Sequence, residues 1–335
     1  MTSQVGVIGA GAWGTALAQM LASDGREVTL WAYEAEVVKA INETRRNPRY
    51  LPSAELHDTI RATGTLSDLA GIDTVLSVTP AQVLGNVLVQ LAEQPRDLVL
   101  CSKGIEAGTG RLMNEVARHA APGAQIAVLS GPTFAHEVAA GLPTAVTLAC
   151  EGGRAQWERL SPVIARPTFR PYYSDDVTGA EIGGSIKNVL AIACGVVEGL
   201  GLGQNARAAL IARGYAEMLR FGESLGAEAE TLAGLCGLGD LVLTCSSTSS
   251  RNFSLGKALG EGASAAELMA DRTTVAEGAH TAPVLAELAQ KRSIAMPIVI
   301  AVNAILAGAS PRRVVADLLA RPLRAEAHSD QPDIA

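Results

Sequence analysis

A glycine-rich segment near the N-terminus constrains the fold of this chain more than any other stretch. The apolar run Val5–Ile8 is followed by Gly9, Gly11 and Gly14, and then by apolar residues at helical spacing from Ala16 to Leu21. This is Gly-x-Gly-x-x-Gly between a predicted strand and a predicted helix. The first glycine allows a tight turn, the second lets a pyrophosphate approach the backbone, and the third lets helix and strand pack closely. Free N–H groups at the helix N-terminus favour the anion. The pattern therefore predicts a dinucleotide site, in preference to a glycine-rich turn without a ligand.

Apolar strands that alternate with helices predict a mainly parallel sheet covered on both faces. Besides the first strand and helix, the expected strands are residues 27–31, 74–78, 98–101, 126–129, 145–150 and 168–173. The expected helices are residues 13–23, 34–42, 80–93, 111–120 and 154–164. Two prolines predict a loop at residues 47–52. We expect an α/β domain of the Rossmann type over residues 1–178.

Helical periodicity replaces the strand pattern from about residue 174 onward. The expected helices are residues 179–197, 206–225, 227–235, 254–259, 264–269, 275–289, 297–306 and 311–319. We therefore expect an all-α domain over residues 179–323, which carries substrate and catalytic residues. The polar segment 324–335 is predicted to be a disordered tail.

Composition and charge narrow the class of function. The 335 residues carry a net charge of −7 and no run of Lys and Arg, which disfavours nucleic-acid binding. An anionic substrate would therefore need local positive charge. Five scattered cysteines without metal-like spacing predict reduced thiols and no metal site. No signal peptide is apparent, and the uncharged stretch Ser293–Ser310 contains Pro297 and Asn303, which favours a buried helix over a membrane span. We expect a cytoplasmic protein.

Polar residues follow two of the predicted strands at their carboxyl ends, where parallel α/β sheets bind ligands. Lys103 comes directly after the strand that ends at Cys101, and Thr133 lies in the segment Ser130–Ala135. Lys103 is a candidate for binding an anion, but a solvated loop lysine is an equal alternative. Thr133 is a candidate ligand residue or the N-cap of a short helix.

The helix expected at residues 179–197 places Lys187 and Asn188 on an otherwise apolar surface. Burial or a nearby cation lowers the pKa of a lysine, which makes it usable as a general acid and base. A lysine that snorkels from the edge of the helix is the alternative.

Two further segments carry candidate site residues. Asp240 lies between a glycine-rich turn and an apolar run, where it could pair with Lys187 or cap the helix that follows. The group Ser250, Arg251 and Asn252 offers donors suited to a phosphate, or forms a polar surface loop with Arg251 exposed.

With these residues considered together, the chain resembles the bacterial NAD(P)-dependent glycerol-3-phosphate dehydrogenases. The matching motifs are Gly9–Ala16, Ser102–Gly104, Ser130–Ala135, Lys187–Asn188, Asn205–Arg207, Gly237–Thr244, Ser250–Asn252 and Val275–Gly278. The resemblance implies a Rossmann domain followed by an all-α domain. It also implies interconversion of dihydroxyacetone phosphate and sn-glycerol 3-phosphate, a role in phospholipid synthesis and a homodimer.

The resemblance further implies a role for each matching residue. Lys187 exchanges a proton with the substrate oxygen, and Asp240 and Lys103 orient the site. The implied cofactor contacts are Gly9, Gly11, Ala12, Trp13, Gly14, Tyr33, Lys103, Ala135, Arg251, Val275 and Glu277. The implied substrate contacts are Lys103, Gly131, Thr133, Lys187, Asp240, Thr244, Ser250, Arg251 and Asn252.

One departure from the family pattern concerns the choice between NAD and NADP. Tyr33 and Glu34 stand where the family often carries Arg or His. An acid there accepts hydrogen bonds from a free ribose 2′-hydroxyl and repels a 2′-phosphate. We therefore predict that NADH is used at least as well as NADPH, unless Arg45, Arg46 or Arg49 folds back to bind the phosphate.

Three other functions are compatible with parts of the sequence. They are a hydroxyacid or ketopantoate reductase, a non-catalytic NAD(P)H sensor and a flavoprotein. The first does not account for Lys103 together with Arg251 and Asn252, and a sensor does not need a paired Lys187 and Asp240.

Overall fold

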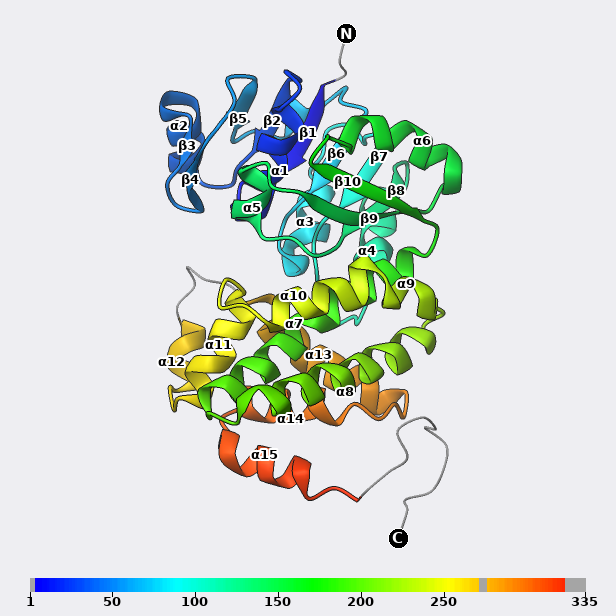
Figure 1. The fold of residues 1–335 in the computed structure, drawn as a ribbon. Helices are drawn as coiled ribbons and strands as arrows, with labels where there is room; N and C mark the ends of the chain where they lie inside the picture. Colours follow the sequence, from blue (N-terminus) through cyan, green and yellow to red (C-terminus); the bar gives the residue numbers. More distant parts are fainter. Residues whose placement is uncertain (1–3, 271–275, 323–335) are drawn as a thin grey trace.

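The computed structural model describes residues 4–270 and 276–322, and its first half is built on an eight-stranded sheet (Figure 1). The strand order is β10-β9-β8-β7-β6-β1-β2-β5. The strands are β1 Val5–Ile8, β2 Val28–Trp31, β5 Ile60–Thr63, β6 Thr74–Ser77, β7 Asp97–Leu100, β8 Gln125–Ser130, β9 Thr144–Cys150 and β10 Phe169–Ser174. All neighbours are parallel except the pair β8 and β9. The order reverses at β1, which lies between β2 and β6, and ligands bind at such switch points.

Apolar side chains cover both faces of this sheet, as expected for parallel strands that are buried on both sides. The helices are α1 Ala12–Ala22, α2 Ala35–Thr44, α3 Leu84–Leu88, α4 Met113–Ala120, α5 Ala135–Ala139 and α6 Gly153–Ile164. One core combines sheet residues with α1, α2, α5 and α6, and the other combines them with α3 and α4. The α/β Rossmann-type architecture is confirmed.

Three local features of this half differ from the predictions. Of the expected loop at residues 47–52, only residues 48–50 form a turn, because β3 (Arg46–Asn47) and β4 (Leu51–Glu55) pair as an antiparallel hairpin on either side of it. Pro52 is tolerated in β4 because it is not among the paired residues of this irregular ribbon. The sequence analysis also missed β5. The helix expected at residues 80–93 consists of a 3₁₀ turn, η2 (Ala81–Val83), and the short α3, because mostly exposed residues follow and little packing stabilises further turns.

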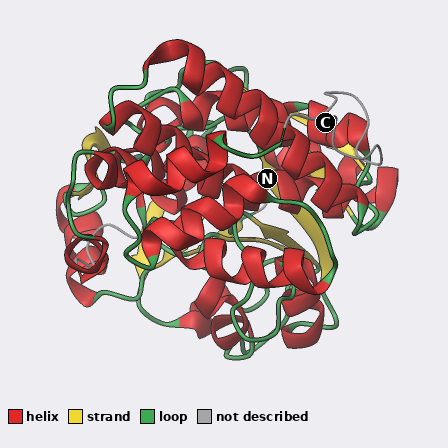
Figure 2. Ribbon diagram, turned by 90° about the horizontal axis from the view of Figure 1, so that it is seen from below, coloured by secondary structure: helices red, strands yellow, loops and turns green. Residues whose placement is uncertain are grey.

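The second half is helical and packs around one central helix, α7 Val177–Gly199. The others are α8 Gly203–Glu223, α9 Ala229–Ala233, the π-helical turn η3 Leu235–Gly239, α10 Asp240–Cys245, α11 Arg251–Gly260, α12 Ala265–Ala270, α13 Glu277–Lys291, α14 Pro297–Leu306 and α15 Pro311–Leu319. Seen from below, these helices lie in front of the strands (Figure 2). The all-α second half is confirmed, whereas the expected tail 324–335 lies outside the described residues.

Burial of α7 explains its apolar sequence. Every residue from Gly179 to Val197 is buried. Within the described residues, α7 is the one helix that is long and apolar enough to cross a membrane, and its most apolar window lies wholly inside the protein. The uncharged stretch Ser293–Ser310 holds α14, which buries Ile298, Val299, Val302 and Ile305.

Candidate active site

The glycine loop after β1 has the geometry that its sequence predicts. Gly9 has a φ of +110°, and a Cβ there would lie 2.9 Å from the Val78 carbonyl oxygen. A Cβ on Gly14 would lie 1.8 Å from the Gly9 carbonyl oxygen, so helix and turn are in direct contact. At Gly11, the N-cap of α1, a Cβ would meet nothing within 4 Å. The loop thus leaves open space beside the backbone at the N-terminus of α1, and this cradle fits a pyrophosphate.

Ala12 and Trp13 continue this loop into α1. No side chain caps the helix, so the N–H groups of its first turn have no side-chain acceptor. Trp13 and Ala135 pack against the same apolar core, on the neighbouring helices α1 and α5. The structure therefore brings two further predicted cofactor residues to the α1 side of the sheet.

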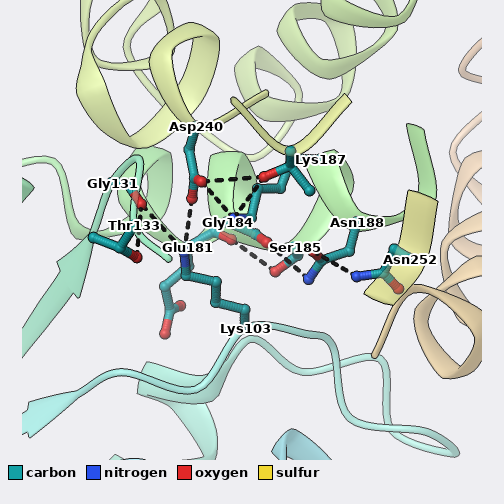
Figure 3. A network of polar contacts seen from close by, with 11 residues as sticks. Lys103, Gly131, Thr133, Glu181, Gly184, Ser185, Lys187, Asn188, Asp240 and Asn252 are labelled. Carbon is teal, nitrogen blue, oxygen red and sulfur yellow. Dashed lines mark hydrogen bonds and ion pairs between the residues drawn. The ribbon is translucent and has the colours of Figure 1, made fainter. Parts of the chain in front are cut away.

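A buried carboxylate forms the centre of the polar network between the two halves (Figure 3). Asp240, the first residue of α10, is fully buried. Its Oδ1 lies 2.5 Å from Lys187 Nζ, and its Oδ2 lies 2.6 Å from Lys103 Nζ. Lys187 Nζ also donates a hydrogen bond to Thr244 Oγ1 at 3.1 Å. One aspartate is thus shared by two lysines, one from α7 and one from the loop after β7.

These contacts decide between the alternatives left by the sequence. Lys187 does not snorkel to the surface, because its side chain is 7% exposed and ends at Asp240. Lys103 is not a solvated loop lysine, since its side chain is only 16% exposed. Asp240 pairs with both lysines, and the structure shows no side-chain cap at the start of α10.

The electrostatics of the network favour a proton-exchanging lysine. Burial lowers the pKa of Lys187 from its usual 10.5 to about 7, while the Asp240 carboxylate opposes the shift and the Lys103 ammonium adds to it. With Lys187 protonated, two cations face one carboxylate. The site therefore carries the local positive charge that an acidic protein needs to bind an anion.

The segment after β8 lies against this network. Lys103 Nζ is 3.5 Å from the Gly131 carbonyl oxygen, to which Thr133 Oγ1 also donates at 3.3 Å. A Cβ on Gly131 would lie 2.9 Å from Val146 Cα, so only glycine fits there. Thr133 does not cap a helix, because α5 begins after Phe134 without a side-chain cap.

The group at residues 250–252 divides between buried and exposed positions. Ser250 is the N-cap of α11, and its hydroxyl accepts from the Phe253 N–H at 3.2 Å. Asn252 Oδ1 accepts from the Gly278 N–H at 2.9 Å, and its Nδ2 donates to Asn188 Oδ1 at 3.0 Å. Arg251 is exposed. Arg251 is therefore exposed, as the surface-loop alternative predicts, but it begins the helix α11, and its two neighbours are buried.

Glu277 is the second acid of the site. Burial raises its pKa to about 7, and the Arg251 guanidinium opposes the shift. A Cβ on Gly104 would lie 3.9 Å from Glu277 Oε2, so this carboxyl lies beside the loop that carries Lys103. The predicted contact Val275 lies outside the described residues.

Tyr33 and Glu34 lie at the end of β2, away from the lysine network. The Tyr33 side chain is 85% exposed, and Glu34 Oε1 accepts from the Tyr50 hydroxyl at 2.6 Å. Each of the three candidate arginines already pairs with a carboxylate. The pairs are Arg45 with Asp58 at 3.5 Å, Arg46 with Glu55 at 3.1 Å and Arg49 with Glu36 at 2.7 Å.

The sequence analysis missed polar residues that complete the site. Thr79 Oγ1 and Ser130 Oγ are buried at the ends of β6 and β8 and have no hydrogen-bond partner in the described part of the chain. Ser130 faces α7, because a Cβ on Gly184 would lie 3.0 Å from its Oγ. Hydroxyls at the carboxyl ends of predicted strands were the signal that could have found them. Across the described residues, no cluster of three His, Cys, Asp or Glu side chains could hold a metal ion.

A Rossmann-type sheet with an open glycine loop, joined to a helical domain that supplies a buried lysine–aspartate pair, defines a two-domain NAD(P)-dependent dehydrogenase. Two family models cover most of the chain: the NAD-dependent glycerol-3-phosphate dehydrogenase N-terminus matches residues 4–156, and its C-terminus matches residues 176–316. The chain belongs to the NAD-dependent glycerol-3-phosphate dehydrogenase family.

Individual relatives agree with this assignment. The glycerol-3-phosphate dehydrogenase [NAD(P)+] of Erythrobacter litoralis is 75% identical over 98% of this chain and 100% of its own length. The one from Novosphingobium aromaticivorans is 74% identical over 97% of this chain and 99% of its own. The crystal structure of glycerol-3-phosphate dehydrogenase from Coxiella burnetii is 41% identical, with a TM-score of 0.91 over 95% of this chain and 99% of that chain.

Proposed function

We propose that this dehydrogenase interconverts dihydroxyacetone phosphate and sn-glycerol 3-phosphate, with Lys187 as the general acid and base. The observation that carries the proposal is the buried Asp240, whose two oxygens hold Lys187 and Lys103. Lys103 follows β7 at the same carboxyl edge of the sheet as the glycine loop after β1. The nicotinamide dinucleotide, when bound, supplies or accepts the hydride.

Lys187 exchanges the proton that the reaction requires. In reduction its ammonium gives a proton to the carbonyl oxygen, and in oxidation its amine takes that proton back from the hydroxyl. A pKa near 7 suits both directions at neutral pH. Asp240 and Thr244 hold Nζ in place, and Lys103 stabilises negative charge on the reacting oxygen.

The phosphate end of the substrate is assigned to the start of α11. Arg251 is exposed there and free to reach a dianion. Asn252 has its carbonyl on Gly278 and one amide N–H on Asn188, which leaves one N–H for the substrate. Ser250 supports this end through its helix cap.

For the cofactor, we infer that NADH is used at least as well as NADPH. The Glu34 carboxylate, held by the Tyr50 hydroxyl, repels a 2′-phosphate, and Arg45, Arg46 and Arg49 are engaged by other acids. We also assign Glu277 and the first turn of α1 to the cofactor.

The cellular role follows from the product. The enzyme would supply glycerol 3-phosphate for glycerophospholipid synthesis in the cytoplasm. Exposed apolar side chains of the helical half, Ile300 in α14 and Leu319 in α15, support a homodimer through this half. The net charge of −7 supports the expectation that nucleic acid is not a partner.

The test measures loss of reduced nicotinamide absorbance with dihydroxyacetone phosphate, using NADH and NADPH in parallel. We expect Lys187→Ala to lose about 10²–10⁴-fold in kcat while its affinity for NADH is unchanged. The matched control is Lys257→Ala, a half-buried lysine of α11 whose ammonium forms an ion pair with Glu261 at 2.6 Å. Cofactor binding without turnover by the wild type would instead indicate a sensor, and a yellow purified protein would indicate a flavoprotein. A higher rate with NADPH than with NADH would contradict the role of Glu34.

A further inference from the structure

The loop that carries Lys103 is held by side chains that take no part in proton transfer. Ser102 Oγ donates to the Thr79 carbonyl oxygen at 2.6 Å, which fixes the loop to the end of β6. Ser185 Oγ on α7 donates to the Glu181 carbonyl oxygen at 2.7 Å and also lies 3.2 Å from the Gly104 carbonyl oxygen. The backbone before Lys103 is therefore anchored to the sheet, and the backbone after it lies against the helical half.

Gln82, in the turn η2, makes two hydrogen bonds to the backbone of this loop. Among the described residues, no other side chain bonds to these two backbone groups. Its Nε2 donates to the Ile105 carbonyl oxygen at 2.9 Å, and its Oε1 accepts from the Ala107 N–H at 2.9 Å. The adjacent Ala81 packs against Gly104, where a Cβ would lie 2.8 Å from the Ala81 methyl carbon. The turn after β6 thus holds the backbone of the loop after β7 in place.

The position of this loop decides where the Lys103 ammonium lies. The methylene groups of Lys103 run beside Gly184, where a Cβ would lie 3.4 Å from Cγ and 3.5 Å from Cδ. Because the stem is confined on this side, a shift of the backbone is transmitted to Nζ and to its 2.6 Å contact with Asp240. A misplacement of about 1 Å can cost about 10²-fold in rate.

We propose that Gln82 is a positioning residue for the dehydrogenase reaction, because it fixes the loop from which Lys103 reaches Asp240. This inference rests on the proposed function, in which Lys103 and Lys187 share Asp240 at the reacting oxygen. Gln82 carries no charge and needs no contact with substrate or cofactor for this role.

A double-mutant cycle separates positioning from general support of the fold. Gln82→Leu removes both hydrogen bonds at similar volume, and it is made in the wild type and in Lys103→Ala. We expect kcat to fall about 10–100-fold in the first background and less than about 2-fold in the second, because there is no longer a lysine to misplace. The matched control is Gln90→Leu, which should keep the wild-type rate because the Gln90 amide donates to the Asn86 carbonyl oxygen and to no other group in the described residues. An equal loss in both backgrounds, or no loss in either, would overturn the proposal.

A second measurement does not require turnover, so it tests the role of Gln82 separately from the proposed reaction. Lys103 is acetylated with limiting acetic anhydride. Mass spectrometry measures the acetylation rate of Lys103 relative to that of the exposed Lys39. We expect Gln82→Leu to raise the rate at Lys103 several-fold and to leave Lys39 unchanged. A wild type inactive on dihydroxyacetone phosphate would reject the proposed function while the labelling still decides the role of Gln82. An unchanged rate at Lys103 would reject that role even if the reaction is as proposed.

Discussion

Asp240 is the residue on which the proposed chemistry of this molecule depends. A buried lysine and aspartate alone would form a neutral pair, which offers an anion little attraction. The second lysine leaves the fully buried carboxylate facing two cations and makes the site electropositive inside a chain of net charge −7. It also lowers the pKa of Lys187, together with burial, into the range in which a lysine can give and take a proton.

The two directions of the reaction should respond to pH with opposite sign. Reduction needs the Lys187 ammonium, so its kcat/KM should be level below pH about 7 and fall as the pH rises above that value. Oxidation needs the neutral amine, so its kcat/KM should rise with pH and become level above about 7. Initial rates from pH 6 to 9 in both directions measure this. The same sign in both directions would exclude Lys187 as the group that exchanges the proton.

Among the elements, the turn between β1 and α1 contains glycines that are required for different physical reasons. Gly14 is required by contact within the protein, because its Cβ would collide with the Gly9 carbonyl oxygen. Gly11 is free of any such contact and has a φ of −67°, which an L-residue adopts without strain. Its lack of a side chain therefore has meaning only in relation to a ligand.

Alanine substitutions should separate stability from binding at this turn. Gly14→Ala should lower the free energy of unfolding by about 1–3 kcal/mol or more, because backbone atoms must move. Gly11→Ala should keep the wild-type melting temperature but bind NADH at least about 10-fold more weakly, a loss of about 1.4 kcal/mol, because a methyl group enters the space assigned to the pyrophosphate. Thermal melts and fluorescence titration with NADH measure both. Wild-type affinity in Gly11→Ala would place the pyrophosphate elsewhere.

At the scale of the whole molecule, one of the apolar clusters contains residues of both halves. Val177 and Ala180 of α7 and Cys236 of the turn η3 belong to the same buried cluster as Leu98 and other residues of the sheet. Polar contacts cross the same junction: Glu181 on α7 accepts from the Asn114 N–H of α4 at 2.8 Å. Burial raises the pKa of Glu181 to about 8, which favours the neutral form of this carboxyl. The site between the halves is therefore held by a common interior.

This shared core predicts that the halves unfold together. All three tryptophans, at 13, 31 and 157, lie in the sheet half, whereas helix content is greatest in the other half. Urea unfolding followed by tryptophan fluorescence and by circular dichroism should therefore give coincident transitions. Leu98→Ala should shift both by the same amount, equivalent to about 2–5 kcal/mol, while Val89→Ala, at a residue that is 63% exposed, should shift neither. Two separate transitions would show that the junction does not couple the halves.

Much of this architecture could be predicted from local patterns. The apolar strands, the glycine turn and the helix that carries Lys187 were predicted to within a few residues, because periodicity and turn chemistry act over short distances. The hairpin at residues 46–55 and the strand β5 were not, because pairing with a neighbour decides whether a polar or proline-containing segment forms a strand.

The sequence by itself determined the class of fold, the dinucleotide loop and the residue types of the site, since each depends on residues that are close together in the chain. Only the tertiary structure decided that Lys103 and Lys187 share one carboxylate, that Ser250 caps a helix and that Gln82 holds the Lys103 loop. Lys103 and Asp240 are 137 residues apart, and a contact of that kind leaves no local pattern. It exists because packing around α7 brings the carboxyl edge of the sheet against α10, where burial and hydrogen bonding fix the remaining geometry.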